Sequence, residues 1–266
     1  MERGGFAKPV PLPLPFQHFD KHRQSARFFR QNASYSATVC CLSLLCGYPI
    51  GAKSAAELYE KGEATTNDCY KMTTFCSTAS PVYAIGTVGL NFLGSLRAGL
   101  ILYASLLSGQ FLCGLIYRNK FVENRLPLTA PPAAKKEDVI GESLLSALKS
   151  ILTVGAYIAL FYMVCEMAAD ALSAVLPPAA ASWATLFSVG FLEMTNGCYA
   201  YAGCFPVQTA TVLCSSAMSF GGVCVFLQCF SFYKKCRLSG GRVMCIKLIQ
   251  SILSGLVCFP LALLLL

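Results

Sequence analysis

The chain has 266 residues, of which 55% are hydrophobic and only 13% are charged, and its formal net charge is +8. Soluble domains average about 25% charged residues, so this composition argues against a soluble protein and predicts an integral membrane protein. The positive charge does not indicate a nucleic-acid-binding surface, because the basic residues stand in short blocks between long uncharged runs.

The first 33 residues are basic and proline-rich, and they contain no apolar stretch typical of a signal peptide. We expect residues 1–33 to form a disordered tail or a segment that lies on the membrane surface. They hold both histidines of the chain, His18 and His22. The 15 cysteines include no C-x-x-C pair, so no metal site and no cofactor is predicted, and the thiols are expected to be free.

Long runs without Asp, Glu, Lys or Arg follow this tail. A helix needs about 20 mainly apolar residues to cross a bilayer, and 98–117, the first part of 151–176, and 248–266 meet this requirement most clearly. The sequence therefore predicts an all-α, polytopic membrane protein with about five spanning helices. The uncharged runs are 31–52, 72–96, 98–117, 171–192, 194–233 and 248–266.

The basic residues predict how the chain is threaded through the membrane. Blocks 1–30, 118–142 and 234–247 are rich in Lys and Arg, whereas 150–233 contains neither residue. The positive-inside rule places the three basic blocks in the cytoplasm and residues 166–180 on the opposite side. Under this scheme 182–203 crosses the membrane once.

The segment "CGYPIGAKSAAELYEKG" (46–62) resembles a phosphate-binding P-loop but departs from its spacing. Ala52 separates Gly51 from Lys53, and Pro49 has no N–H to donate. We instead predict the tip of a re-entrant hairpin, with a half-helix that starts near Ala52. Its positive N-terminal end and Lys53 would suit an anionic group, and the candidate ligand-binding residues here are Gly47, Tyr48, Gly51, Lys53 and Ser54.

A second glycine-rich tip is predicted inside 207–233, which must enter and leave on the same side. With its surroundings it resembles the first tip, so we expect two repeat-like halves, 34–117 and 143–266, joined by a basic linker, 118–142. Repeated, discontinuous segments often mark a transporter's binding site, because irregular backbone survives at membrane depth only inside protein or beside a cavity. The candidate residues here are Ser219, Gly221, Gly222 and Gln228.

An acidic residue, Glu193, interrupts an otherwise uncharged stretch in "FLEMTNG". A carboxyl group at membrane depth is costly and suggests function by default, although it could also be paired structurally with Asn196 or Lys53. Thr195, Asn196 and the glycine after them can break a helix and present polar groups to a cavity, so both polar residues join the candidate site.

The first half has its own polar stretch, "FCSTASPVYAIG" (75–86), which we interpret as the counterpart of "FLEMTNG". Ser77, Thr78 and Ser80 precede Pro81, a good first residue for a helix. All three are candidate ligand-binding residues. Small hydroxyl residues also pack membrane helices with no ligand involved, and this alternative stays open.

Taken in order, "GYPIGAK", "ELYEKG", "FCSTASPVYAIGTVG", "FLEMTNG" and "SFGGVCVFLQ" resemble the YlbJ (SpoVV) sporulation integral membrane proteins. These belong to the wider group that carries the nucleoside-recognition Gate domain. The resemblance covers about residues 40–260. It implies a transporter of endospore-forming bacteria, in the cell membrane or the outer forespore membrane. It also implies movement of dipicolinic acid, a small aromatic dianion, from the mother cell toward the forespore.

The chain departs from this family in three places. Members usually have further membrane segments before "GYP", so we expect an N-terminally shortened chain. The family's Asn-Asn-Ala-Gly-Pro is replaced by the residues at 77–81, and Phe226 stands where the family has a histidine. The last two changes touch presumed ligand positions, so the resemblance leaves the substrate open.

These observations favour a transporter for a small organic anion, with the lipid bilayer as its other partner. A homo-oligomer is left open. The alternatives are a nucleoside-like metabolite carrier and a non-transporting scaffold of a sporulation complex. An enzyme is not predicted, because no histidine lies in the apolar runs to act as a base beside Glu193.

Overall fold

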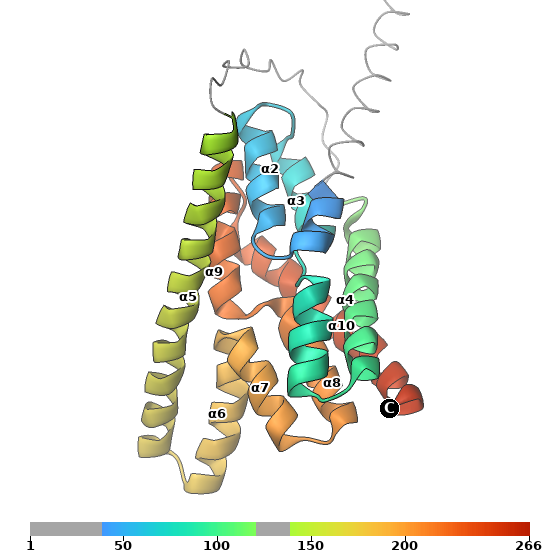
Figure 1. Cartoon of the computed structure of the whole chain (residues 1–266), viewed down its shortest axis with the longest axis vertical. Helices are drawn as coiled ribbons and strands as arrows, with labels where there is room; N and C mark the ends of the chain where they lie inside the picture. The colour runs from blue at the N-terminus through green and yellow to red at the C-terminus, as the bar shows by residue number, and fades with distance from the viewer. Residues whose placement is uncertain (1–38, 121–138) are drawn as a thin grey trace, which may run out of the picture. The chain divides into compact units, whose positions relative to one another are not determined.

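A computed structural model describes residues 39–120 and 139–266 (Figure 1). The predicted tail 1–33 and most of the predicted linker 118–142 lie outside these residues. Within the described ranges all regular elements are helices, which confirms the all-α prediction. After a helical segment at 39–46 they are α2 (Ile50–Glu60), α3 (Thr66–Phe75), η1 (Val82–Phe92), α4 (Leu96–Tyr117), α5 (Val139–Val175), α6 (Pro178–Leu192), α7 (Met194–Cys204), α8 (Val207–Phe220), α9 (Gly222–Tyr233), η2 (Lys234–Cys236) and α10 (Gly240–Leu265).

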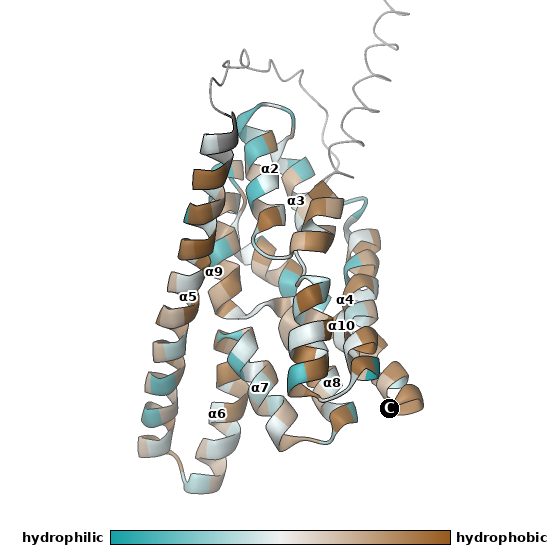
Figure 2. Ribbon diagram, viewed as in Figure 1, coloured by the Kyte–Doolittle hydropathy of each residue, from teal (hydrophilic) through white to brown (hydrophobic). Residues whose placement is uncertain are grey.

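Four stretches of the described chain are long and apolar enough to cross a membrane, and Figure 2 shows apolar residues along much of their length. They are Leu96–Tyr117, Leu144–Val175, Val207–Cys236 and Gly240–Leu265, and the shorter apolar helices η1 and α6 accompany them. At 1.5 Å per residue, α4 is about 33 Å long, close to the bilayer's apolar thickness of about 30 Å. The chain therefore has the make-up of a multi-pass membrane protein.

Helices α4, α8 and α10 pack closely together because small residues line their contacts. A methyl group added at Gly109 of α4 would lie 2.8 Å from the Ser254 backbone nitrogen of α10. The hydroxyl of the same Ser254 lies 2.7 Å from that of Ser215 on α8, and the two share a hydrogen bond. Leu102 and Leu106 of α4 are fully buried in the same cluster.

Helices α6 and α7 fold back on each other at Glu193, so the predicted single crossing by 182–203 is wrong (Figure 1). Glu193 is extended (φ −140°, ψ 118°) and separates the two helices. Beyond it, a methyl group on Gly197 would lie 2.3 Å from the Gly190 Cα atom. The two glycines let the helices approach closely, and the chain reverses instead of continuing.

The predicted hairpin tip at 219–222 is a joint between α8 and α9. Gly221 and Gly222 both have positive φ angles, 88° and 72°, which end α8 and redirect the chain. Helix α8 packs mainly on α4, α7 and α10, whereas α9 packs on α2, α5 and α6, and the two helices make few contacts with each other. The structure therefore does not confirm a hairpin here.

Candidate functional site

Four interruptions of the helices lie against one another. They are the turn at 47–49, the irregular stretch between α3 and Pro81, the reversal at Glu193, and the joint at Gly221 and Gly222. Added methyl groups at Gly47 and Gly222 would lie 2.6 Å from the Ser80 nitrogen and 2.9 Å from the Leu192 oxygen, respectively. The turn at 47–49 thus packs against the backbone before Pro81, and the joint at Gly222 packs against the backbone before Glu193.

The carbonyl groups at the end of α3 are satisfied by side chains from other helices. A helix end leaves its last carbonyls without partners, and in apolar surroundings such groups are costly. The donors to them are Ser43 Oγ (to Cys76 O), Gln110 Nε2 (to Ser77 O, 3.0 Å), Lys247 Nζ (to Ser77 O, 2.7 Å) and Gln250 Nε2 (to Thr74 O, 2.6 Å). Gly51 packs here too, close to the Cys76 oxygen.

Lys247 is the most unusual of these donors, because its side chain is only 3% exposed. The sequence places it in a cytoplasmic basic block, but the structure buries it inside α10's contact with the end of α3. No carboxylate of the described residues pairs with it. Its ammonium group lies 5.1 Å from the centre of the Tyr48 ring, a cation–π contact. The Ser77 carbonyl, the negative end of α3 and this ring are its compensation.

Buried polar atoms without hydrogen-bond partners occur near this lysine. Among the described residues they are Ser77 Oγ, Thr78 Oγ1, Ser219 Oγ and Gln250 Oε1. Buried polar atoms are nearly always paired, so an unpaired group requires an explanation. Three of the four belong to residues that the sequence predicts as ligand-binding, and Gln250 lies one turn beyond Lys247 on α10.

Two tyrosines connect the two parts of the chain across these interruptions. Tyr48 donates from its hydroxyl to the Met218 carbonyl at 2.9 Å, which links the turn at 47–49 to the end of α8. Tyr83, at the start of η1, donates to the Thr195 hydroxyl at 3.0 Å. Each hydroxyl bridges residues more than 100 positions apart.

Glu193 is 1% exposed, and its carboxylate caps the N-terminus of α7. One oxygen accepts from the Thr195 backbone N–H at 3.0 Å and the other from that of Asn196 at 2.8 Å. Glu193 is therefore held by the backbone of its own turn, not by the Asn196 side chain or by Lys53. The helix break that the sequence assigns to 195–197 occurs at Glu193 itself.

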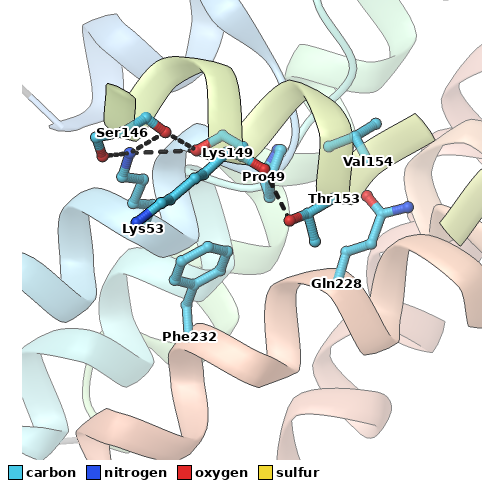
Figure 3. Close-up of a pocket in the computed structure, with 9 residues that line it drawn as sticks. Pro49, Lys53, Ser146, Lys149, Thr153, Val154, Gln228 and Phe232 are labelled. Atoms are coloured by element: carbon cyan, nitrogen blue, oxygen red, sulfur yellow. Dashed lines mark hydrogen bonds between the residues drawn. The ribbon is translucent and has the colours of Figure 1, made fainter. Parts of the chain in front are cut away.

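The structure places three predicted residues, Lys53, Ser54 and Gln228, outside the group of interruptions around Lys247. Lys53 donates to the hydroxyls of Ser146 at 2.6 Å and Ser150 at 3.2 Å, both on α5. With Gln228 of α9 it lines a pocket of about 190 Å³ (Figure 3). The neighbouring Ser54 is half-buried on α2.

The other predicted residues gather around the four interruptions. The turn at 47–49 and the break at 76–81 meet the α8–α9 joint through Tyr48, and the reversal at Glu193 meets η1 through Thr195. The predicted residues in this region are Gly47, Tyr48, Gly51, Ser77, Thr78, Ser80, Glu193, Thr195, Asn196, Ser219, Gly221 and Gly222.

Sequence reasoning missed the polar residues of α4 and α10. Lys247, Gln250 and Ser254 are spaced three and four residues apart, so they share one face of an otherwise apolar helix. That spacing is the signal that could have identified Lys247 as buried. Gln110 stands alone in its apolar run and carries no such pattern.

Comparison with known protein families, curated proteins and solved structures found no match.

Proposed function

We propose that this chain is a membrane transporter for a small organic anion, which it binds at Lys247. The observation that carries the proposal is a buried ammonium group with no carboxylate partner among the described residues. Burial of a charge that is balanced only by a carbonyl group and a ring, with no counter-charge, is expensive, and an ionisable residue at membrane depth suggests function by default. An anion would provide the missing charge.

The groups around Lys247 suit a ligand with more than one polar end. The unpaired hydroxyls of Thr78 and Ser219 can donate to carboxylate oxygens. Helix α9 has no side-chain cap from the described residues at its N-terminus, and that end carries partial positive charge. The dianion dipicolinate, which the sequence resemblance implies, is therefore the first ligand to test.

We also infer two inverted repeats, in a different register from the one that the sequence suggests. The order of a reversal, an interrupted helix pair and a long helix occurs twice. In the first half the reversal is 39–60, the interrupted pair is α3 with η1, and the long helix is α4. In the second half they are α6 with α7, α8 with α9, and α10. The second helix of each reversal packs on the second helix of the interrupted pair in the other half. Thus α2 packs on α9, and α7 packs on η1. In this register the turn at 47–49 corresponds to Glu193. Inverted repeats with interrupted helices are typical of alternating-access transporters.

The two alternatives predict different behaviour from Lys247. In a scaffold, the lysine would only neutralise the carbonyl end of α3, and no ligand would bind. In a nucleoside-like carrier, the unpaired hydroxyls and the Gln250 oxygen would be the main ligand-binding groups. The positive charge of Lys247 favours an anion over both.

Binding of dipicolinate to the purified chain in detergent tests this proposal, with uridine as the neutral competitor. We expect wild-type binding of dipicolinate and its loss in Lys247→Met, which keeps the length and removes the charge. Lys235→Met is the matched control, because Lys235 is exposed and pairs with Glu60 at 2.9 Å.

Size-exclusion profiles of the three proteins show whether each is folded. Unchanged affinity in a folded Lys247→Met variant would overturn the assignment of Lys247. Uptake into liposomes then separates a transporter from a scaffold: a wild-type chain that inserts but accumulates no labelled dipicolinate would contradict transport of this anion.

A further inference from the structure

A pocket of about 190 Å³ lies between the start of α2, the first third of α5, and α9 (Figure 3). Lys247 does not line it, although Pro49 belongs to the turn that holds Tyr48 beside Lys247. Pockets that enclose drug-sized ligands measure about 300–1,000 Å³, so this one suits a single small group. Its lining residues are Pro49, Lys53, Ser146, Lys149, Ser150, Thr153, Val154, Gln228 and Phe232.

The pocket has the chemistry of an anion site. Lys53 and Lys149 both line it, and no carboxylate does among the described side chains. The ammonium group of Lys53 is held by two serine hydroxyls, at 2.6 and 3.2 Å, and these neutral partners leave its charge uncompensated. Hydroxyl groups can also donate to a phosphate or carboxylate oxygen once they turn from their present partners.

Gln228 provides a second indication of a ligand. Its side chain is 3% exposed and borders the pocket. Its nitrogen donates to the Cys224 sulfur at 3.3 Å, which is a weak acceptor. No described group accepts from the second N–H of this nitrogen, which can therefore donate to an oxygen of an anion. A buried amide with so little satisfied capacity is expected to interact with something else.

Helix α5 connects the pocket to the surroundings of the protein. In an apolar stretch of 18 residues within Leu144–Val175, only 6% of the residues are buried. Leu144, Leu145, Leu148 and Ile151 are exposed on the same turns that supply Ser146, Lys149 and Ser150 to the pocket. A ligand with a charged head and apolar chains would match both surfaces.

The end of α5 near the pocket follows the basic block 118–142, which the charge pattern places on the cytoplasmic side. Anionic lipids of that leaflet attract Lys and Arg, and basic pockets between membrane helices bind their head groups. We infer that the pocket lined by Lys53, Lys149 and Gln228 holds the phosphate of an anionic phospholipid, whose acyl chains lie along the exposed side of α5. This inference does not depend on the transport proposal.

Native mass spectrometry of the full-length chain, titrated with phosphatidylglycerol, tests the inference. The test variant is Lys53→Gln/Lys149→Gln, and the matched control is Lys61→Gln/Lys234→Gln, which removes two exposed charges. We expect at least about tenfold weaker retention in the test variant, which corresponds to about 1.4 kcal/mol, because both positive charges that face the phosphate are removed. The control should match the wild type.

Two further arms identify the ligand. Phosphatidylcholine has the phosphate without net negative charge and should be retained more weakly than phosphatidylglycerol. Glycerol phosphate lacks the acyl chains and should not displace the lipid at equal concentration. If it does, the pocket binds free phosphate and the lipid assignment is wrong.

Equal retention of phosphatidylglycerol by the wild type and the test variant would overturn the inference. The single variant Lys149→Gln guards against misfolding, because Lys149 is exposed and its loss leaves the contacts of Lys53 in place. It should show an intermediate loss of lipid. If Lys149→Gln retains the lipid as well as the wild type does, Lys149 does not bind the phosphate and its assignment to the site is wrong.

Discussion

Two helix breaks in this protein face the same physical problem and resolve it differently. At 76–81, the carbonyls in the last turn of α3 and just after it accept hydrogen bonds from the side chains of α4 and α10, including the ammonium group of Lys247. At Gly221 and Gly222, left-handed backbone redirects the chain, and the backbone around Glu193 packs directly against the joint. The first break is therefore sensitive to charge, and the second to volume.

The largest effect is expected at the first break. Lys247→Met should weaken dipicolinate binding at least about thirtyfold, because loss of one partner from a buried charged contact costs about 2–5 kcal/mol. Lys53→Gln should change the affinity less than about threefold, since Lys53 faces α5. Isothermal titration of both variants measures the difference. The reverse order of effects would return the ligand site to Lys53.

The next largest effect concerns volume at the second break. Gly222→Ala should lower the stability by about 2–5 kcal/mol, through a left-handed alanine (about 1–2 kcal/mol) and a clash with the Leu192 carbonyl (about 1–3 kcal/mol). Gly94→Ala is the control for strain alone, because its φ is also positive (64°) and it has open space around it. Denaturant unfolding in detergent should separate the two. Equal losses would show that the joint is not closely packed.

A smaller effect is expected from the cap that supports the second break. Glu193→Ala removes both acceptors of the α7 N-terminus and should cost about 0.5–2 kcal/mol. Glu193→Gln keeps one carbonyl oxygen and should lose less. Thermal unfolding of the two variants measures this order. A glutamine variant as unstable as the alanine variant would mean that the negative charge, not the cap geometry, is required.

The smallest effect tests the contact between the two regions. Tyr48→Phe removes the hydrogen bond to Met218 but keeps the ring beside Lys247. We expect a stability loss of about 0.5–1.5 kcal/mol and little change in ligand affinity. A large loss of affinity would instead show that the Tyr48 hydroxyl binds the ligand.

The sequence predicts where the helices are interrupted better than what each interruption does. Pro81 and the glycine pair at 221–222 mark real interruptions, because each has a local cause in the backbone. The break that the sequence assigns to 195–197 lies instead at Glu193, whose side chain caps α7. Whether the chain then reverses or continues depends on close approach between distant residues. Gly190 and Gly197 meet across α6 and α7, and no local pattern reveals that contact.

Contacts between distant residues also explain why the sequence favours Lys53 over Lys247 as the ligand-binding lysine. Lys53 stands next to a glycine-rich motif, so the sequence favours it as the ligand-binding charge. Lys247 is at the end of a basic block, which makes it look like a surface residue. Only the packing of α10 on α3 and α4 places its ammonium group at the Ser77 carbonyl.

The close contacts among α4, α8 and α10 have a mechanical consequence. There is no space for a methyl group between Gly109 of α4 and Ser254 of α10, so these helices have little freedom to slide past each other. We therefore expect α4, α8 and α10 to move as one rigid pivot. Conformational change would then be confined to the short helices around it. The sulfur of Cys258 lies 3.7 Å from the backbone carbonyl oxygen of Thr211. If the chain transports an anion as proposed, a disulfide between Thr211→Cys and Cys258 should accordingly leave the transport rate unaltered, and loss of transport would show that the pivot itself must flex.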